Sequence, residues 1–134
     1  FTNGDFSVSG LSQTLNTVVA YESRGTLNSV RLTSRTYPSG SFSFQLADYS
    51  DVGVGNISDF ILKGGGYSTN VSTLGAAAEV YGVKLTLTVE GTDHGDSGDH
   101  TVVLDDCACT MDLAEGDPNS GTISFICYGS PTLT

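Results

Sequence analysis

The chain is dominated by an alternation of apolar and polar residues with a period of two. In residues 41–46, Phe42, Phe44 and Leu46 alternate with serine and glutamine, and in residues 83–89 valine and leucine alternate with lysine and threonine. A period of two places successive side chains on opposite faces of a strand. Both segments are therefore predicted to be β-strands with one buried face.

A β-hairpin is predicted close to the C-terminus. Residues 107–113 alternate in the same way, and a second β-rich run covers residues 122–128. The turn-rich segment Asp117-Pro118-Asn119-Ser120-Gly121 separates the two runs. Two such runs joined by a short turn are typical of a hairpin.

Less regular alternation predicts further strands in the rest of the chain, at residues 5–11, 14–22, 27–33 and 59–63. Only residues 74–80 have helical character, and seven residues are too few for a helix that is stable on its own. Eight to ten short strands separated by glycine- and proline-containing turns predict an all-β chain, a single antiparallel β-sandwich or jelly-roll-like domain.

Within that domain the N-terminus has a pattern of its own. We expect residues 1–13 to be an extended segment and residues 14–134 to form the β-sandwich. The segment carries spaced apolar residues that suit a donor strand added to the open sheet edge of a neighbouring copy, namely Phe1, Phe6, Val8 and Leu11. The alternative is that residues 5–11 form the first strand of the chain's own sheet, and the sequence leaves both open.

Charge and composition narrow the range of partners. The chain has 15 acidic and 5 basic residues, a net charge of −10, which disfavours binding to nucleic acid or to anionic membranes. Its apolar runs are far shorter than the roughly 20 residues of a membrane-spanning helix. Seventeen Ser, sixteen Thr and only two Lys, in a chain that begins with Phe1, predict a processed protein that is secreted, extracellular or on the cell surface.

Three cysteines lie within the predicted hairpin. A loop centred near residue 117 or 118 brings Cys127 opposite either Cys107 or Cys109, depending on the register. We therefore expect a disulfide between Cys127 and one of these two residues. The third cysteine is then a buried thiol or a partner for an intermolecular bond.

The segment 92–100 concentrates acidic side chains and both histidines. Asp93, Asp96 and Asp99 are a weak candidate for a structural calcium site, since Ca²⁺ prefers oxygen ligands from flexible loops, but a solvated acidic loop is the simpler interpretation. Residues 95–98 resemble the nucleophile segment of chymotrypsin-like serine proteases over four residues, and the following Asp99-His100 departs from that pattern. We expect no catalytic residue, no enzymatic activity and no other cofactor.

Two acceptor sequons for N-linked glycans, at Asn56 and Asn70, agree with an extracellular location. The absence of a catalytic constellation and the acidic, Ser/Thr/Gly-rich composition favour a structural subunit that binds copies of itself in a filament, pilus-like fibre or surface layer. Tyrosines near predicted loops can stack on sugar rings. A secreted carbohydrate-binding or adhesin module is therefore the alternative.

Overall fold

The computed structural model describes residues 6–12, 15–45, 56–75 and 78–134, and within these ranges the chain is all-β, as predicted. The strands are β1 (Phe6–Ser9), β2 (Asn16–Ser23), β3 (Thr26–Arg35), β4 (Ser39–Gln45), β5 (Gly82–Val89), β6 (His100–Ala114), β7 (Ser120–Cys127) and β8 (Thr132–Leu133). The helical elements are α1 (Ile57–Leu62) and the 3-10 turns η1 (Gly65–Tyr67) and η2 (Thr92–His94). None of the helices in the described ranges is long and apolar enough to cross a membrane.

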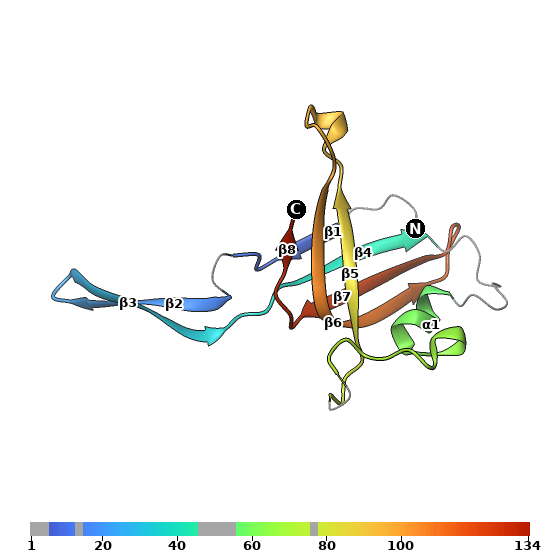
Figure 1. Cartoon of the computed structure of the whole chain (residues 1–134), viewed down its shortest axis with the longest axis horizontal. Helices are drawn as coiled ribbons and strands as arrows, with labels where there is room; N and C mark the ends of the chain where they lie inside the picture. Colours follow the sequence, from blue (N-terminus) through green and yellow to red (C-terminus); the bar gives the residue numbers. More distant parts are fainter. Residues whose placement is uncertain (1–5, 13–14, 46–55, 76–77) are drawn as a thin grey trace.

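The strands form one curled antiparallel sheet and one separate hairpin. The order in the large sheet is β1-β4-β7-β6-β5, with β8 paired to β6, whereas β2 and β3 pair only with each other. This second, two-stranded sheet extends away from the body of the molecule as an arm (Figure 1). The antiparallel all-β prediction is confirmed, and the sandwich arrangement within it is not, since the described strands fall into one six-stranded sheet and one two-stranded sheet.

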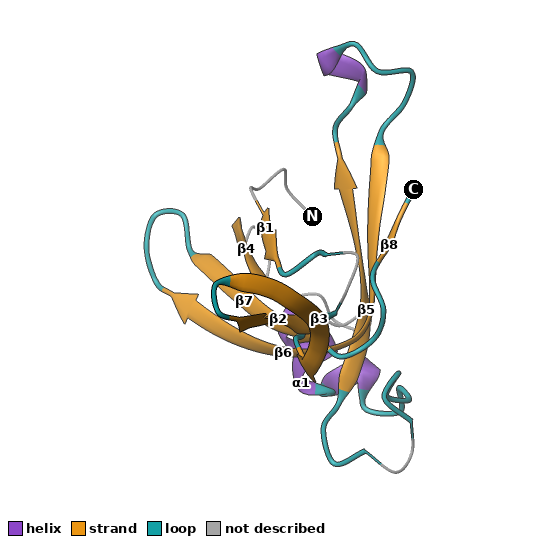
Figure 2. Ribbon diagram, turned by 90° about the vertical axis from the view of Figure 1, so that its left-hand side faces the viewer, coloured by secondary structure: helices purple, strands orange, loops and turns teal. Residues whose placement is uncertain are grey.

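A bulge in β6 bends the large sheet. The first half of β6 pairs with β5 and β8, and its second half pairs with β7. One extra residue of β6 is inserted into its pairing with β5 between Val83 and Leu85, and Asp106 there has a φ of 57°. Aspartate tolerates this left-handed conformation better than most residues, and a bulge bends the strand that contains it. The β5–β6 hairpin therefore stands across β4 and β7, as Figure 2 shows.

The core fills the angle of the bent sheet. Its buried residues are Val83, Leu85, Val102, Leu104, Cys107, Phe125 and Cys127, with Phe44, Ile61 and Ile123 in an adjoining cluster. The ring of Phe44 lies over Gly121, where a Cβ atom would come within 2.4 Å of the ring. A glycine is required at this position for β4 and β7 to pack in register.

Residues 57–62 form the helix α1, so the strand predicted at 59–63 is wrong. The side-chain oxygen of Asn56 accepts a hydrogen bond from the Asp59 backbone N–H at 2.9 Å, which caps the helix N-terminus. Its apolar residues then recur at helical spacing, and Ile61 is buried in the core. A short apolar run does not by itself distinguish a strand from a buried helix.

The helical character predicted at residues 74–80 is also absent from the described residues of that segment. Gly75 has a φ of +86°, which interrupts a right-handed helix, and residues 76–77 lie outside the described ranges. The other strand predictions are confirmed: β1 falls within residues 5–11, and β2 and β3 overlap residues 14–22 and 27–33 but extend beyond them. The predicted C-terminal hairpin is β6 and β7, although β6 begins earlier, at His100.

Candidate functional site

The β2–β3 arm is the most distinctive surface of the molecule. Its two strands are joined by Arg24 and Gly25, which have φ values of 51° and 77°. Positive φ at both central residues gives the turn that matches the right-handed twist of a hairpin. The arm is therefore a well-formed local structure that none of the other described strands extends.

One face of the arm is apolar and open to solvent. In the antiparallel register Val18 lies opposite Leu32, Ala20 opposite Val30, and Glu22 opposite Leu27. Residues that pair directly share a face of the sheet. The exposed fractions are 53% for Val18, 55% for Val30, 58% for Leu32 and 59% for Leu27. A monomer in water thus leaves a continuous apolar strip of this arm unburied.

The other face of the arm is polar and basic. Val19 lies opposite Arg31, and Tyr21 lies opposite Ser29. The guanidinium of Arg31 lies over the ring of Tyr21, 5.7 Å from its centroid. This contact holds a positive charge on the side of the arm that faces away from the apolar strip.

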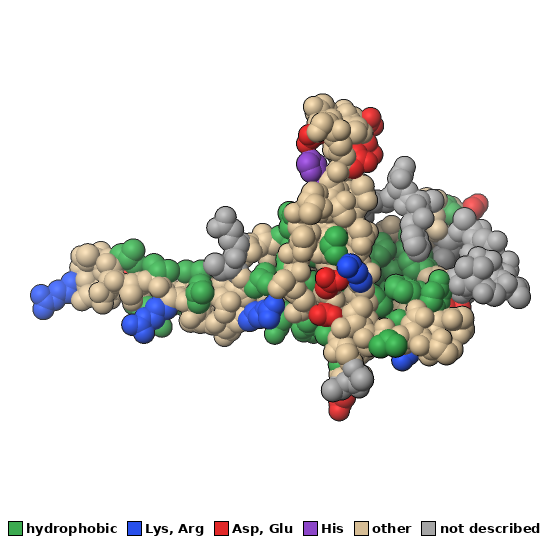
Figure 3. Space-filling model, viewed as in Figure 1, with side chains coloured by type: hydrophobic (Ala, Val, Ile, Leu, Met, Phe, Trp, Pro, Cys, Tyr) green, Lys and Arg blue, Asp and Glu red, His purple; other side chains and the backbone are tan. Residues whose placement is uncertain are grey.

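The charges of the chain are divided between the arm and the rest of the chain. Residues 16–35 hold three of the five basic residues, all of them arginine, and one of the fifteen acidic residues. The arm therefore carries a net charge of +2 and the remainder of the chain carries −12. Figure 3 shows the basic side chains along the arm and acidic side chains at the end of the β5–β6 hairpin.

The N-terminal residues predicted to act in assembly lie at the edge of the large sheet, apart from Phe1, which is outside the described residues. Phe6 lies opposite Phe42 and Val8 opposite Gly40, so β1 pairs with β4 of the same chain. Val8 packs against the buried core, and Leu11, beyond the strand, is exposed. Within this chain, residues 6–9 are therefore the first strand of their own sheet.

The cysteines are brought together by the β6–β7 register. Cys107 lies opposite Cys127, both fully buried, while Cys109 lies opposite Phe125. All three are free thiols in the structure. Burial raises the pKa of Cys107 and of Cys127, and it raises the pKa of Cys109 to about 11. Of the two disulfides left open by the sequence, the register favours Cys107 with Cys127.

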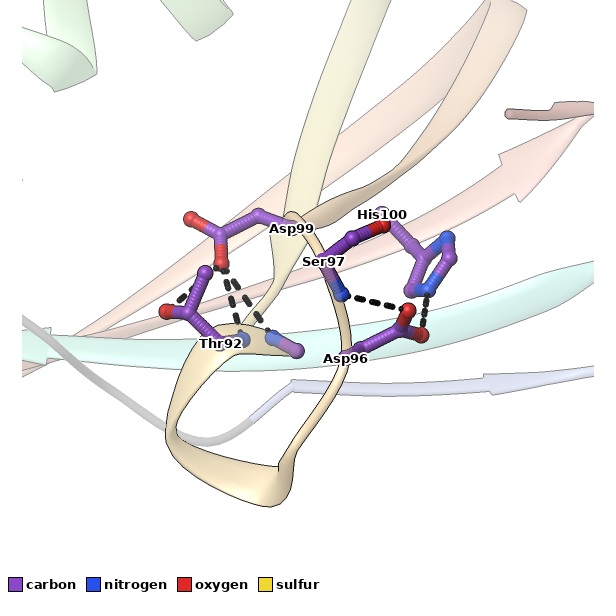
Figure 4. A network of polar contacts seen from close by, with 6 residues as sticks. Thr92, Asp96, Ser97, Asp99 and His100 are labelled. Carbon is purple, nitrogen blue, oxygen red and sulfur yellow. Dashed lines mark hydrogen bonds and ion pairs between the residues drawn. The ribbon is translucent and has the colours of Figure 1, made fainter.

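The acidic loop between β5 and β6 uses its carboxylates internally (Figure 4). Asp96 accepts hydrogen bonds from the Ser97 backbone N–H at 2.8 Å and contacts Nε2 of His100 at 2.6 Å. Asp99 accepts from the backbone N–H groups of Gly91 and Thr92. These hydrogen bonds lower the pKa of both carboxyl groups, that of Asp96 chiefly through His100.

The weak calcium candidate gains no support from this geometry. Asp93, Asp96 and Asp99 do not converge with other ligands, and no group of three or more His, Cys, Asp or Glu side chains among the described residues is placed to hold a metal ion. The Asp96–His100 pair lies beside Ser97, but it contacts the serine through the backbone N–H. The loop is stabilised by its own polar groups.

The two glycosylation sequons lie in different environments. Asn56 is half-buried and its side-chain oxygen caps α1, also accepting a hydrogen bond from Ser58. Asn70 is also half-buried, but it lies in the segment after η1, next to the strongly exposed Val71. Asn70 is therefore placed where an attached glycan would disturb no helix cap.

Exposed aromatic residues gather at the base of the arm. The rings of Tyr37 and Tyr128 lie 4.9 Å apart at an angle of 59°, and both residues are exposed. Arg35 lies over the ring of Tyr37. Tyr67 instead packs edge-on against Phe60, while Tyr49 lies outside the described residues.

Sequence reasoning identified β2 and β3 as strands but missed that they form a separate arm. The turn Arg24-Gly25 between two β-rich runs indicates the hairpin, and all three arginines cluster around it, but neither feature shows that the hairpin stands apart from the body. Comparison of the chain with known protein families, with curated proteins and with solved structures gave no match.

Proposed function

We propose that this protein is a structural subunit of a self-assembling extracellular structure, such as a filament, a pilus-like fibre or a surface layer. The observation that carries this proposal is the exposed apolar face of the β2–β3 arm. An isolated two-stranded hairpin is at best marginally stable in water and needs a surface to pack against. An apolar strip of this kind on a soluble domain is typical of a protein–protein contact.

The test is the state of association of the intact chain. We expect sedimentation velocity to show assembly that grows with concentration, and electron microscopy of the same unheated material to show regular filaments or sheets. A variant in which residues 16–35 are replaced by a short Gly-Ser linker should stay monomeric. Circular dichroism checks that its sheet is intact. A wild-type chain that remains a 14 kDa particle at all concentrations would contradict the proposal.

Strand addition by the N-terminus is part of the same proposal. Because β1 is a short strand at the sheet edge, the corresponding strand of a neighbouring copy can replace it on β4 without changing the hydrogen-bond pattern. Deletion of residues 1–12 distinguishes exchange of β1 between copies from pairing within one chain. Exchange between copies predicts a folded monomer that binds an added peptide of residues 1–12 and no longer polymerises. If β1 pairs only within its own chain, the deletion should lower the stability of the fold, and the chains that remain folded should associate as before.

Carbohydrate binding is the second candidate, favoured by the exposed Tyr37–Tyr128 pair. Aromatic rings of this kind can pack on the apolar faces of sugars. A glycan array with the wild type and with Tyr37→Ala tests it, using Tyr67→Ala as a control for an aromatic residue that packs internally. Specific retention that is lost only in Tyr37→Ala would displace the structural proposal.

A further inference from the structure

The arm needs a partner surface, and charge indicates which one. Two arms stacked on each other would bury both apolar faces but would bring together segments that each carry +2. The rest of the chain carries −12, and residues 85–134 contain nine acidic residues and no lysine or arginine. Complementary charges favour an arm that contacts the body of another copy, and like charges disfavour contact between arms.

Two acidic ends are available on the body. The end of the β5–β6 hairpin, residues 90–99, has no apolar side chain, and its Asp96 and Asp99 are already hydrogen-bonded within the loop. The end of the β6–β7 hairpin combines acidic residues with an exposed apolar one. Leu113 continues the core-facing row of β6 beyond Met111 and is 51% exposed, with Asp112 and Glu115 exposed beside it.

The β6–β7 end also lies at the opposite end of the long axis from the arm (Figure 1). A contact between two different surfaces at opposite ends of one molecule cannot close a pair of copies by two-fold symmetry. Repeated from copy to copy, such a contact generates an open filament wherever its rotation does not close a ring. The positions of the two surfaces, their opposite charges and their exposed apolar residues therefore all favour the same head-to-tail contact.

We propose that the β2–β3 arm docks on the acidic β6–β7 end of a second copy of this chain. The apolar strip of the arm covers Leu113, and the net positive charge of the arm, which includes Arg31 on its other face, attracts the acidic residues of that end, Asp112, Glu115 and Asp117. This inference rests on the proposed function and names the two surfaces that meet.

Charge exchange between the two surfaces tests the proposal. The arm variant is Arg31→Glu with Arg35→Glu, and the end variant is Asp112→Lys with Glu115→Lys. The control variant is Lys63→Glu with Lys84→Glu, which changes the net charge by the same amount as the arm variant at exposed positions outside the arm. Circular dichroism and thermal unfolding check that each variant is folded, and sedimentation velocity measures assembly.

We expect the arm variant and the end variant, each alone, to need at least about tenfold higher concentration for assembly than the wild type, which corresponds to about 1.4 kcal/mol per contact. An equimolar mixture of the two should assemble again, because the acidic arm of one then meets the basic end of the other. The control variant should assemble like the wild type.

Three results would overturn the docking proposal while leaving the proposed function intact. The first is assembly of the arm variant at the wild-type concentration, and the second is assembly of the end variant at that concentration. The third is an equimolar mixture that does not assemble although each variant alone has lost assembly. Closed dimers of the arm variant would show that arms contact each other instead. A wild type that never assembles contradicts the proposed function itself.

Discussion

At the scale of single residues, glycines decide how closely the strands approach. A Cβ atom on Gly40 would lie 2.0 Å from the Ser7 carbonyl oxygen and 2.8 Å from the Phe125 ring. Gly40 thus allows β1 to lie against β4 while Val8 reaches the core. The sequence shows glycine at this position, but only the register reveals why no other residue fits.

Gly40→Ala is therefore expected to destabilise the fold by about 1–3 kcal/mol, the usual cost of overpacking. Because the closest atom belongs to the backbone, β1 must move rather than a side chain. Chemical denaturation measures the change in the free energy of unfolding. Gly98→Ala is the control, since its Cβ would meet nothing within 4 Å, and it should change stability by less than about 0.5 kcal/mol. Equal effects of the two substitutions would contradict the packing argument.

The acidic loop gives a prediction for pH. The pKa of Asp96 is lowered chiefly by its hydrogen bond with His100, and that of Asp99 by the Gly91 and Thr92 N–H groups. A carboxyl group whose pKa is lower in the folded state contributes stability above its unfolded pKa and loses it as the pH falls through the folded pKa. The loop should therefore stay ordered at neutral pH and loosen below about pH 4.

NMR can follow this loosening through the backbone amides of Gly91, Thr92 and Ser97 as the pH is lowered. We expect these amides to change before those of β7. Asp99→Asn should reproduce the change at Gly91 and Thr92 at neutral pH and leave Ser97 unaffected, since Ser97 donates to Asp96. A loop that changes only together with the whole sheet would argue against local stabilisation by these carboxylates.

At the scale of elements, alternation predicted strands well wherever one face is buried against the core. It failed at residues 59–63, where the chain forms a helix that Asn56 caps. An apolar run this short is compatible with both a helix and a strand, so the pattern alone could not decide between them. It also gave no sign of the bulge at Asp105 and Asp106, because left-handed backbone at a non-glycine residue depends on the tertiary fold. The bend of the sheet could therefore not be predicted from the sequence.

The β6–β7 pairing makes a specific prediction for the cysteines. The Tyr128 N–H donates to the Asp106 carbonyl at 3.1 Å, so Cys107 and Cys127 form a non-hydrogen-bonded pair of the ladder. The Cα atoms of such pairs are about 4.5 Å apart, within the range of a disulfide. Oxidation by glutathione disulfide, which takes up the two thiol protons and two electrons as two glutathione thiols, should link these residues and leave Cys109 free.

Because burial raises the pKa of these thiols, the bond should form during refolding rather than in the folded chain. Mass spectrometry of peptides after alkylation identifies the linked pair, and the bond should add about 2–4 kcal/mol to the free energy of unfolding. Cys109→Ala should retain both the bond and the gain, and Cys107→Ser should lose them. A Cys109–Cys127 bond would contradict the register.

At the scale of the whole molecule, the separation of the arm from the body could not be predicted from the sequence. The pattern of residues 16–35 is that of an ordinary half-buried hairpin, and nothing local distinguishes a face buried in its own core from one left exposed. The asymmetry of charge was visible, with all three arginines in one segment, but it became a surface only when the fold placed that segment on an arm.

That asymmetry predicts how assembly depends on salt. Raising the sodium chloride concentration from about 0.1 M to about 1 M shortens the Debye length from about 10 Å to about 3 Å and weakens attraction between exposed charges. If the positive charge of the arm attracts the acidic β6–β7 end, the concentration needed for assembly should rise with salt, as measured by sedimentation velocity. The arm variant with Arg31→Glu and Arg35→Glu should show the opposite trend, because salt then screens repulsion. If the apolar strip alone holds the assembly, salt should leave assembly unchanged or strengthen it in both the wild type and the arm variant. That result would show that charge does not determine how the copies recognise one another.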